Sequence, residues 1–145
     1  MKLVLDSDVV IAGLISSKGA GHFLLSNFLP HKKVKIFTSK EQIKEIELVM
    51  RRPSFIWQAN KKLWESFKKD SAKVKLSPKS IKKLTNYLND PSDVHILAAA
   101  ISGKARFLLT YNIKHYQREK IKEDFNLLVV RPGFFLQYWR LRERE

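Results

Sequence analysis

Four short apolar runs, separated by stretches of helical character, most constrain how this chain can fold. They lie at residues 2–6, 34–38, 106–110 and 127–130, and each is rich in residues that favour strands. Short apolar runs of this kind are typical of strands that are buried on both faces. Parallel strands need crossover connections and lie between layers of helices. The pattern therefore predicts a single α/β domain over residues 1–145, a three-layer α/β/α sandwich with a central, mainly parallel sheet.

The stretches between these runs carry the spacing and capping residues of helices. Ser39 is a suitable N-cap, and the sequence Asp90-Pro91-Ser92-Asp93 is typical of a helix start. Asp6-Ser7-Asp8 favours a turn, so we expect a loop after the first strand. Helices are expected at residues 20–29, from 40 to Met50, twice within residues 55–88, at residues 94–102, and after Pro132.

The chain carries a large excess of positive charge. Its 28 Lys and Arg against 14 Asp and Glu give a formal net charge of +14. Such an excess favours a polyanionic partner, first nucleic acid and second anionic lipid, and a solvated lysine-rich surface is the alternative. Residues 1–30 have no net charge, whereas the nine lysines in residues 61–83 face only Glu65 and Asp70. On the functional interpretation this stretch binds phosphates beside an acidic pocket.

Cysteine is absent, which excludes disulfide frameworks, thiol catalysis and zinc held by cysteine. The longest apolar run near the N-terminus covers residues 9–15, and its seven residues fall short of the roughly 20 that a spanning helix needs. Asp6 and Asp8 would interrupt the apolar part of a signal peptide. We therefore expect a soluble, cytoplasmic protein that is not inserted in a membrane.

Acids and amides follow successive strands, where ligands bind in open parallel sheets. Carboxylates that converge in one cleft call for a divalent cation, and oxygen ligands without cysteine favour Mg²⁺ or Mn²⁺. Each residue also has a structural explanation: Asx turns, a helix cap at Asp90, or a solvent-facing helix side. The residues concerned are Asp6 and Asp8 after the first strand, Glu41, Glu45 and Glu47 after the second, Asp90 and Asp93 before the third, and Thr110 and Asn112 after it.

Several segments resemble those of the PIN-domain ribonucleases. LDSDVVIAGLIS resembles the end of that family's first strand, where Asp is followed by Ser or Thr and then Asn or Asp. Residues 93–100 (DVHILAAA) resemble its acidic helix start, residues 109–116 (LTYNIKHY) its Thr-x-Asp/Asn element, and RPGFFLQ its closing junction. The resemblance implies an α/β/α sandwich and a Mg²⁺- or Mn²⁺-dependent endoribonuclease. In this family such an enzyme is often the toxin of a toxin-antitoxin pair.

The same resemblance assigns roles to individual residues. It implies that Asp6, Glu45 and Asp93 are metal ligands, with Glu47 as the alternative to Glu45. Asn112 stands where many members have a fourth acid, and it would position the attacking water or a second ion. An amide supplies no negative charge, so this departure bears on the second ion.

Other residues are expected around these acids. Asp8, where many members have Asn, can compensate for the lost charge, and Ser7, Thr110 and Lys114 are expected to contact the substrate. His22, His95 and His115 do not have the spacing of a metal site, so surface or packing roles are favoured for them.

Aromatic residues allow two interpretations. Trp57, Trp64 and Phe67 could stack bases, but their helical spacing favours a core-facing stripe. The aromatic segment 134–139 is expected to pack on the core, with an interface in a homodimer or with an antitoxin as the alternative.

The leading hypothesis is thus an endoribonuclease with RNA as substrate. The alternative is a PIN-like RNA-binding protein of weak or absent activity, because Asn112 replaces an acid. A nuclease that acts on structured DNA is a third hypothesis.

Overall fold

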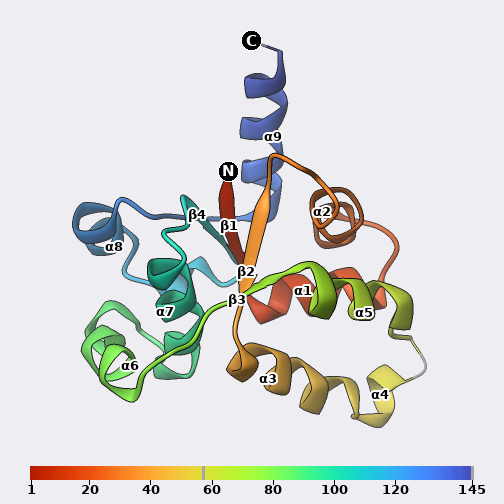
Figure 1. Ribbon diagram of the computed structural model, residues 1–145, viewed down its shortest axis with the longest axis horizontal. Coiled ribbons are helices and arrows are strands. Elements are labelled where there is room, and N and C mark those ends of the chain that lie inside the picture. The colour runs from red at the N-terminus through yellow and green to blue at the C-terminus, as the bar shows by residue number, and fades with distance from the viewer. Residues whose placement is uncertain (57, 145) are drawn as a thin grey trace.

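The computed structural model describes residues 1–56 and 58–144 and alternates strands with helices (Figure 1). The strands are β1 (Lys2–Leu5), β2 (Lys35–Thr38), β3 (Ala72–Lys73), β4 (Phe107–Leu109) and β5 (Leu128–Val130). The helices are α1 (Ser7–Ile15), α2 (Ala20–Phe28), α3 (Lys40–Met50), α4 (Pro53–Ile56), α5 (Lys61–Asp70), α6 (Pro78–Leu84), α7 (Val94–Ser102), α8 (Arg118–Phe125) and α9 (Pro132–Glu143). Short 3₁₀ turns are η1 (Thr85–Tyr87), η2 (Pro91–Asp93) and η3 (Ile113–His115).

The five strands form one parallel sheet in the order β3-β2-β1-β4-β5. The central strand β1 pairs with β2 on one side and with β4 on the other, so that Leu3 stands between Ile36 and Phe107. The chain first builds the sheet outward through β2 and β3, and then returns to the other side of β1. This reversal makes the carboxyl ends of β1 and β4 a topological switch point, where side chains that follow the strands converge.

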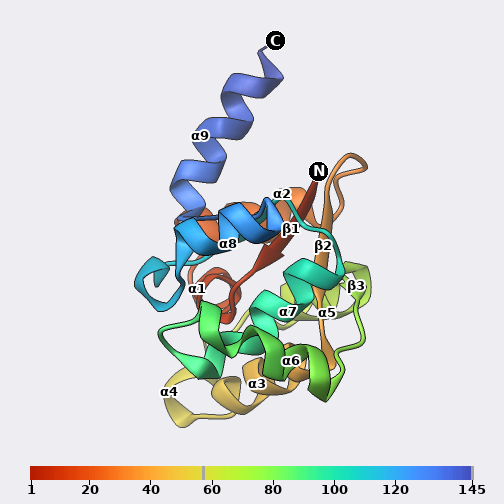
Figure 2. The ribbon, with the colours of Figure 1, turned by 90° about the vertical axis from the view of Figure 1, so that its left-hand side faces the viewer.

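Two hydrophobic cores lie on opposite faces of the sheet. Leu3 and Leu5 of β1 belong to the core covered by α1, α2, α5 and α9, while Val4 between them belongs to the core covered by α6, α7 and α8. Figure 1 shows the strands with α6, α7 and α8 on one side and α1, α2 and α5 on the other, and Figure 2 looks onto the side of α6, α7 and α8. Side chains of a strand alternate between faces, so an apolar run without polar positions requires helices on both sides. The predicted three-layer α/β/α sandwich is confirmed.

The sequence located most elements but not the first helix. The Ser39 hydroxyl accepts a hydrogen bond from the Gln42 amide at 3.2 Å, so the predicted cap of α3 is confirmed. The expected loop after Asp6 is wrong, because the Asp6 carboxylate caps a helix that starts at Ser7. Helix α1 is apolar on nearly all sides, since it lies between the sheet and α2, and it therefore lacks amphipathic spacing. Strand β3 and helices α4 and α8 were not anticipated.

The aromatic residues mostly serve the core, as expected. Trp64 and Phe67 are buried and stack with ring centroids 5.7 Å apart. Phe135 is fully buried, and Trp139 packs edge-on against Phe28 at 5.1 Å. Trp57 lies outside the described residues.

No single helix in residues 1–56 and 58–144 is long and apolar enough to cross a membrane. Only α1 and α2 together reach that length and composition, and they meet at an angle of 91°.

The contact between α1 and α2 depends on two glycines. A Cβ at Gly13 would lie 2.7 Å from the backbone carbonyl carbon and oxygen of Gly21. A Cβ at Gly21 would lie 2.7 Å from the carbonyl oxygen of Val9. Such distances are shorter than van der Waals contact, so a larger residue at either position would separate the two helices.

We predict that Gly13→Ala lowers the free energy of unfolding by about 1–3 kcal/mol, because overpacking outweighs the roughly 1 kcal/mol that Ala gains in a helix. Gly133→Ala is the control, since nothing lies within 4 Å of a Cβ there and the substitution should be neutral or slightly stabilising. Urea denaturation of both variants measures the difference. A Gly13→Ala variant as stable as the control would show that the helices do not meet this closely.

Candidate active site

The candidate active site lies where β1 and β4 end. Asp6 follows β1 directly, and its backbone amide donates to the Leu109 carbonyl oxygen at 2.8 Å. Thr110 follows β4 and is fully buried. Helix α3, which follows β2, contacts both α1 and helix α7, and α7 precedes β4 (Figure 1). Four segments far apart in the sequence therefore meet here, as the sequence predicted.

The Asp6 carboxylate is the centre of this arrangement and is only 4 % exposed. Its Oδ1 accepts a hydrogen bond from the Ser7 amide at 2.7 Å. Its Oδ2 accepts from the Thr110 hydroxyl at 2.9 Å and from the Tyr116 hydroxyl at 3.0 Å. Burial, followed by the charges of Asp8 and Asp93, raises the pKa of Asp6 to about 7, although the two hydroxyl donors oppose this. At neutral pH the carboxyl therefore keeps a proton in part of the molecules unless a cation compensates its charge.

Asp8 lies on the first turn of α1 beside Asp6. Its Oδ2 accepts from the Tyr111 amide at 3.0 Å and from the Asn112 side-chain amide at 3.1 Å. Its Oδ1 is buried and has no hydrogen-bond partner among the described residues. Burial raises the pKa of Asp8, partly offset by its backbone hydrogen bonds. A buried, unpartnered carboxylate oxygen is an acceptor for a ligand that the chain itself does not supply.

Glu45 reaches the site from α3. Its Oε1 accepts hydrogen bonds from the Ser7 hydroxyl and, at 3.2 Å, from Nε2 of His95 on α7. Burial raises the pKa of Glu45, but the two hydrogen bonds and the charge of His95 together outweigh burial, so that the pKa lies below its ordinary value. Of the two glutamates considered from sequence, Glu45 is thus the one linked through Ser7 to Asp6. The carboxylate is ionised and held in one orientation.

Asp93 stands at the start of α7 and is paired with a second histidine. Its Oδ2 lies 2.8 Å from Nδ1 of His115, which is also 3.7 Å from Oδ2 of Asp90. Burial raises the pKa of Asp93, and the hydrogen bond and charge of His115 oppose it. The Asp90 carboxylate accepts from the backbone amide and hydroxyl of Ser92, at 3.0 and 2.7 Å. Asp90 therefore caps the turn before α7, which was the structural explanation considered for it.

Three residues of this network were missed from sequence. His95, His115 and Tyr116 each bind a site carboxylate, whereas the histidines were expected at the surface or in packing. The His95–Glu45 contact joins positions 50 residues apart, and no spacing rule marks it. Tyr116 is brought to Asp6 by an isolated bridge to Leu88. The sequence offered one signal for the two histidines: each lies within three residues of a predicted site residue.

The residues expected to contact substrate lie at the site in different ways. The hydroxyls of Ser7 and Thr110 already donate to Glu45 and Asp6, and both side chains are buried. Thr110 also accepts from the Asn112 backbone amide at 3.0 Å. Lys114 is exposed on η3, next to His115. Ser7 and Thr110 therefore orient the acids, while the side chain of Lys114 is accessible from outside.

Comparison with protein families decides the family. The PIN domain model matches residues 2–114, which is most of the chain. The chain belongs to the PIN-domain family. Proteins with PIN domains are generally nucleases, so membership supports a hydrolytic role.

The solved structures support the same fold for this PIN domain. One chain of the crystal structure of VapBC2 from Rickettsia felis, bound to a DNA fragment from their promoter, is similar with a TM-score of 0.61 and 19% sequence identity. The alignment covers 89% of this chain and 97% of that chain. No curated protein sequence matches. At this identity the structural likeness establishes the fold.

The site residues of this PIN domain fit a hard divalent cation. The raised pKa of Asp6 and the unpartnered oxygen of Asp8 both indicate negative charge that lacks compensation. Within the described residues, only Asp90, Asp93 and His115 each place a ligand atom within 4.8 Å of the others, so Asp6, Glu45 and Asp93 are more widely spaced. Mg²⁺ usually keeps several waters and binds one or two carboxylates, which suits such a spacing.

We predict that Asp6 makes stability fall with rising pH. The carboxyl releases its proton near pH 3.8 when unfolded and near pH 7 when folded, so between these values unfolding releases a proton and the free energy of unfolding decreases, by up to about 4 kcal/mol. Asp6→Asn removes this loss. The stability of Asp6→Asn relative to the wild type should therefore rise between pH 4 and pH 8, as measured by urea denaturation in EDTA. A constant difference would contradict the raised pKa.

Proposed function

We propose that this PIN domain is a Mg²⁺- or Mn²⁺-dependent endoribonuclease. The observation that carries the proposal is the group of carboxylates at the switch point of the sheet, the buried Asp6 with the half-buried Asp8 and Asp93, in a chain with a net charge of +14. A purely structural cluster of acids would cost stability without compensation. The positive charge of the rest of the chain would attract a polyanion to the acidic site, which by itself would repel one.

In this proposal the acids hold the cation, and the residues around them have separate tasks. Asp6, Glu45 and Asp93 would hold the cation together with its waters, and the cation would supply Lewis-acid activation of the phosphate and of the attacking water. Ser7 fixes the relative orientation of Asp6 and Glu45, since its amide binds the first and its hydroxyl the second. Thr110 and Tyr116 hold the other oxygen of Asp6. Lys114, exposed at the rim, would bind a substrate phosphate.

Asn112 supports the alternative function, an RNA-binding PIN-like protein of weak or absent activity. Its side-chain amide donates to Asp8 Oδ2 at 3.1 Å, so it compensates an existing carboxylate and adds no negative charge of its own. A second cation would find one charge fewer than in relatives with an acid here. We therefore assign Asn112 to orienting Asp8 and the attacking water, with one cation in the site.

We further propose a protein partner of antitoxin type, because a similar solved structure is a VapBC2 complex. A groove of about 170 Å³ between α2 and α9 offers an apolar surface for such a partner or for a second copy of the chain. Phe23 at its border is 43 % exposed. Purification of the chain together with the product of the neighbouring reading frame tests the partner.

We predict that the purified protein cleaves RNA with Mn²⁺ or Mg²⁺, that EDTA abolishes cleavage, and that Asp93→Asn lowers kcat/KM by roughly 100-fold or more. Glu119→Gln, an exposed acid on α8, is the matched control and should retain full activity. Gel analysis of end-labelled RNA and of a DNA of the same sequence gives both rates. Equal rates for the wild type and Asp93→Asn would exclude this site, and cleavage of DNA alone would favour the DNA nuclease.

We predict that Asn112→Asp makes the site more dependent on metal. The new carboxylate would lie beside Asp8 Oδ2 in place of a donor, so the melting temperature without metal should fall at pH 8, and the increase produced by Mn²⁺ should exceed that of the wild type. Asn126→Asp, a left-handed cap of α8 outside the site, controls for the charge change. Thermal unfolding with and without Mn²⁺ measures both shifts. An unchanged Mn²⁺ effect would show that position 112 does not face the cation.

A further inference from the structure

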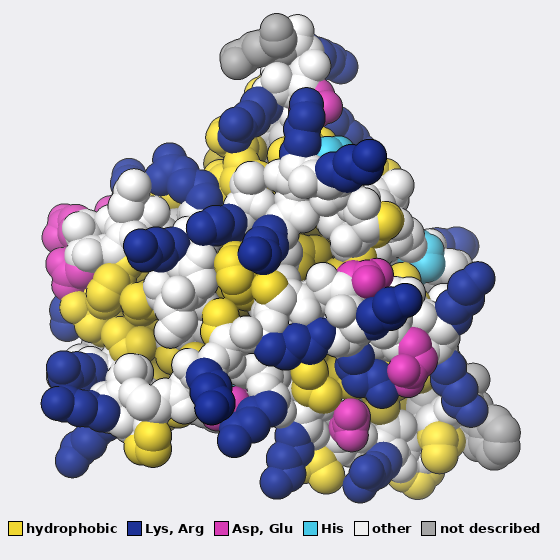
Figure 3. Space-filling view, viewed as in Figure 1, with side chains coloured by type: hydrophobic (Ala, Val, Ile, Leu, Met, Phe, Trp, Pro, Cys, Tyr) yellow, Lys and Arg dark blue, Asp and Glu magenta, His cyan; other side chains and the backbone are white. Residues whose placement is uncertain are grey.

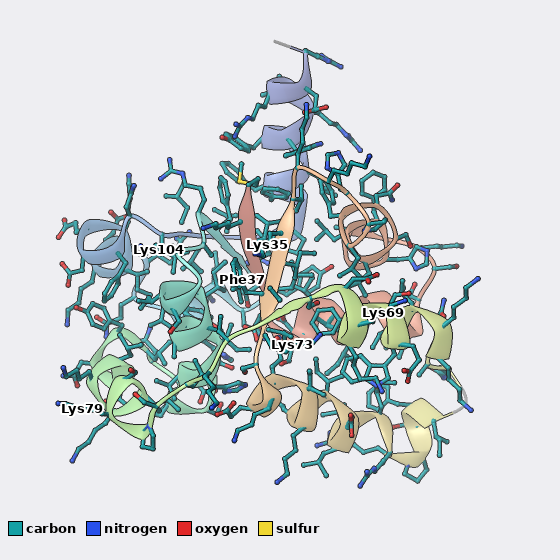
Figure 4. The ribbon with its side chains drawn as sticks, viewed as in Figure 1. Lys35, Phe37, Lys69, Lys73, Lys79 and Lys104 are labelled. Atoms are coloured by element: carbon teal, nitrogen blue, oxygen red, sulfur yellow. The ribbon has the colours of Figure 1, made fainter. Side chains whose placement is uncertain are left out.

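A second feature, outside the acidic site, is a face rich in lysine that includes the β2–β3 edge of the sheet and the adjoining helices. We call it the edge face and define it by Lys35, Lys69, Lys73, Lys79 and Lys104. Figure 4 shows these residues on one side of the molecule, with Phe37 among them, and Figure 3 shows basic side chains spread over the same view. They come from five places in the fold, namely β2, the end of α5, β3, α6 and the turn after α7. All five side chains are exposed.

The lysines of the edge face are not neutralised by the chain itself. Among the described residues, the pair Lys68–Glu65 is the only one that joins a lysine or arginine to a carboxylate within 4.0 Å. Four of the chain's acids, Asp6, Asp8, Glu45 and Asp93, are used at the candidate active site. The edge face therefore keeps its full positive charge for an external anion.

The ring of Phe37 lies against both Lys35 and the turn that precedes Lys104. The Lys35 ammonium lies 5.6 Å from the centroid of the Phe37 ring. Gly103 packs on the same ring so closely that a Cβ would lie 2.8 Å from its Cγ. Lys104 follows with φ at 55°, a left-handed conformation that favours Gly or Asn. Glycine would be less strained at this position than the lysine that occupies it.

Lys73 connects the edge face to the active-site edge. It pairs in register with Thr38, the last residue of β2, and its ammonium donates to the carbonyl oxygens of Ser71, at 2.8 Å, and Lys68. Thr38 is followed by Ser39, the cap of α3, which carries Glu45. From Lys35 to Thr38 the strand rises about 10 Å, the length of one or two nucleotides of backbone. The lysines thus lead along the sheet toward the carboxylates.

We propose that the edge face binds the phosphodiester backbone of RNA on one side of the scissile bond. This inference rests on the proposed function. Lysines on an exposed edge strand prevent it from pairing with another chain in many sheets. That role can explain only Lys73, because the other four lysines are not on β3. Ammonium groups that reach phosphates contribute affinity without sequence specificity and release counterions. The edge face therefore determines which length of RNA binds well and how strongly binding depends on salt, whereas the acidic site determines the chemistry.

The test uses the full chain with Lys35→Ala, Lys73→Ala and Lys104→Gly combined. Lys104→Gly relieves the left-handed backbone, so this change does not destabilise the fold. The control combines Lys18→Ala, Lys122→Ala and Arg142→Ala, which remove the same charge from the α1–α2 loop, α8 and α9. Fluorescence anisotropy of a labelled 20-nucleotide single-stranded RNA in EDTA, over a series of salt concentrations, measures binding. Circular dichroism confirms that both variants are folded.

We expect the edge-face variant to bind at least about 10-fold more weakly at 0.1 M salt, with the slope of log K against log salt reduced by about 2, while the control binds nearly as the wild type does. Equal losses in the two variants would overturn the edge face as a distinct surface. With Mn²⁺, the edge-face variant should cleave a tetranucleotide as the wild type does and show a higher KM for the 20-nucleotide RNA. Absence of any cleavage would refute the proposed function, and the binding result in EDTA would still decide the edge face.

Discussion

The burial of one carboxylate at the end of β1 organises this structure. Asp6 caps α1 through the Ser7 amide, and its other oxygen binds Thr110 after β4 and Tyr116 after η3. The first helix, two neighbouring strands and a later loop are thereby fixed to a single group. An ionised carboxylate in such a position is costly unless it is compensated, and the pKa near 7 expresses that cost. The same interaction that joins the segments leaves a site that favours a cation.

Paired imidazoles moderate the remaining negative charge. His95 binds Glu45, and His115 binds Asp93, so two of the four acids have an imidazole partner from the chain. Asp6 and Asp8 are served only by neutral donors among the described residues. The uncompensated charge is thus concentrated on the first two acids, at the switch point. A divalent cation bound there would compensate that charge.

Positive and negative charge are separated in space as well as along the chain. The acids lie at the carboxyl end of β1 and on α1, α3 and η2, whereas the lysines of the edge face lie on and around the β2–β3 edge of the sheet. Because these two groups are not paired with one another, the positive field of the lysines is not cancelled. The scarcity of ion pairs between basic and acidic side chains in the described residues is what this division requires.

The sequence by itself determined the layered α/β fold, because unbroken apolar strands need helices on both faces. It also marked three candidate site positions by short local patterns: Asp6 after the first strand, Asp93 at a helix start, and Asn112 after a later strand. Only the tertiary structure decided the start of α1, where capping by Asp6 replaced the expected loop. It alone also brought His95 to Glu45, Tyr116 to Asp6 and Gly103 to the ring of Phe37. These contacts join distant segments across the sheet, and no local spacing in a single sequence records such a meeting.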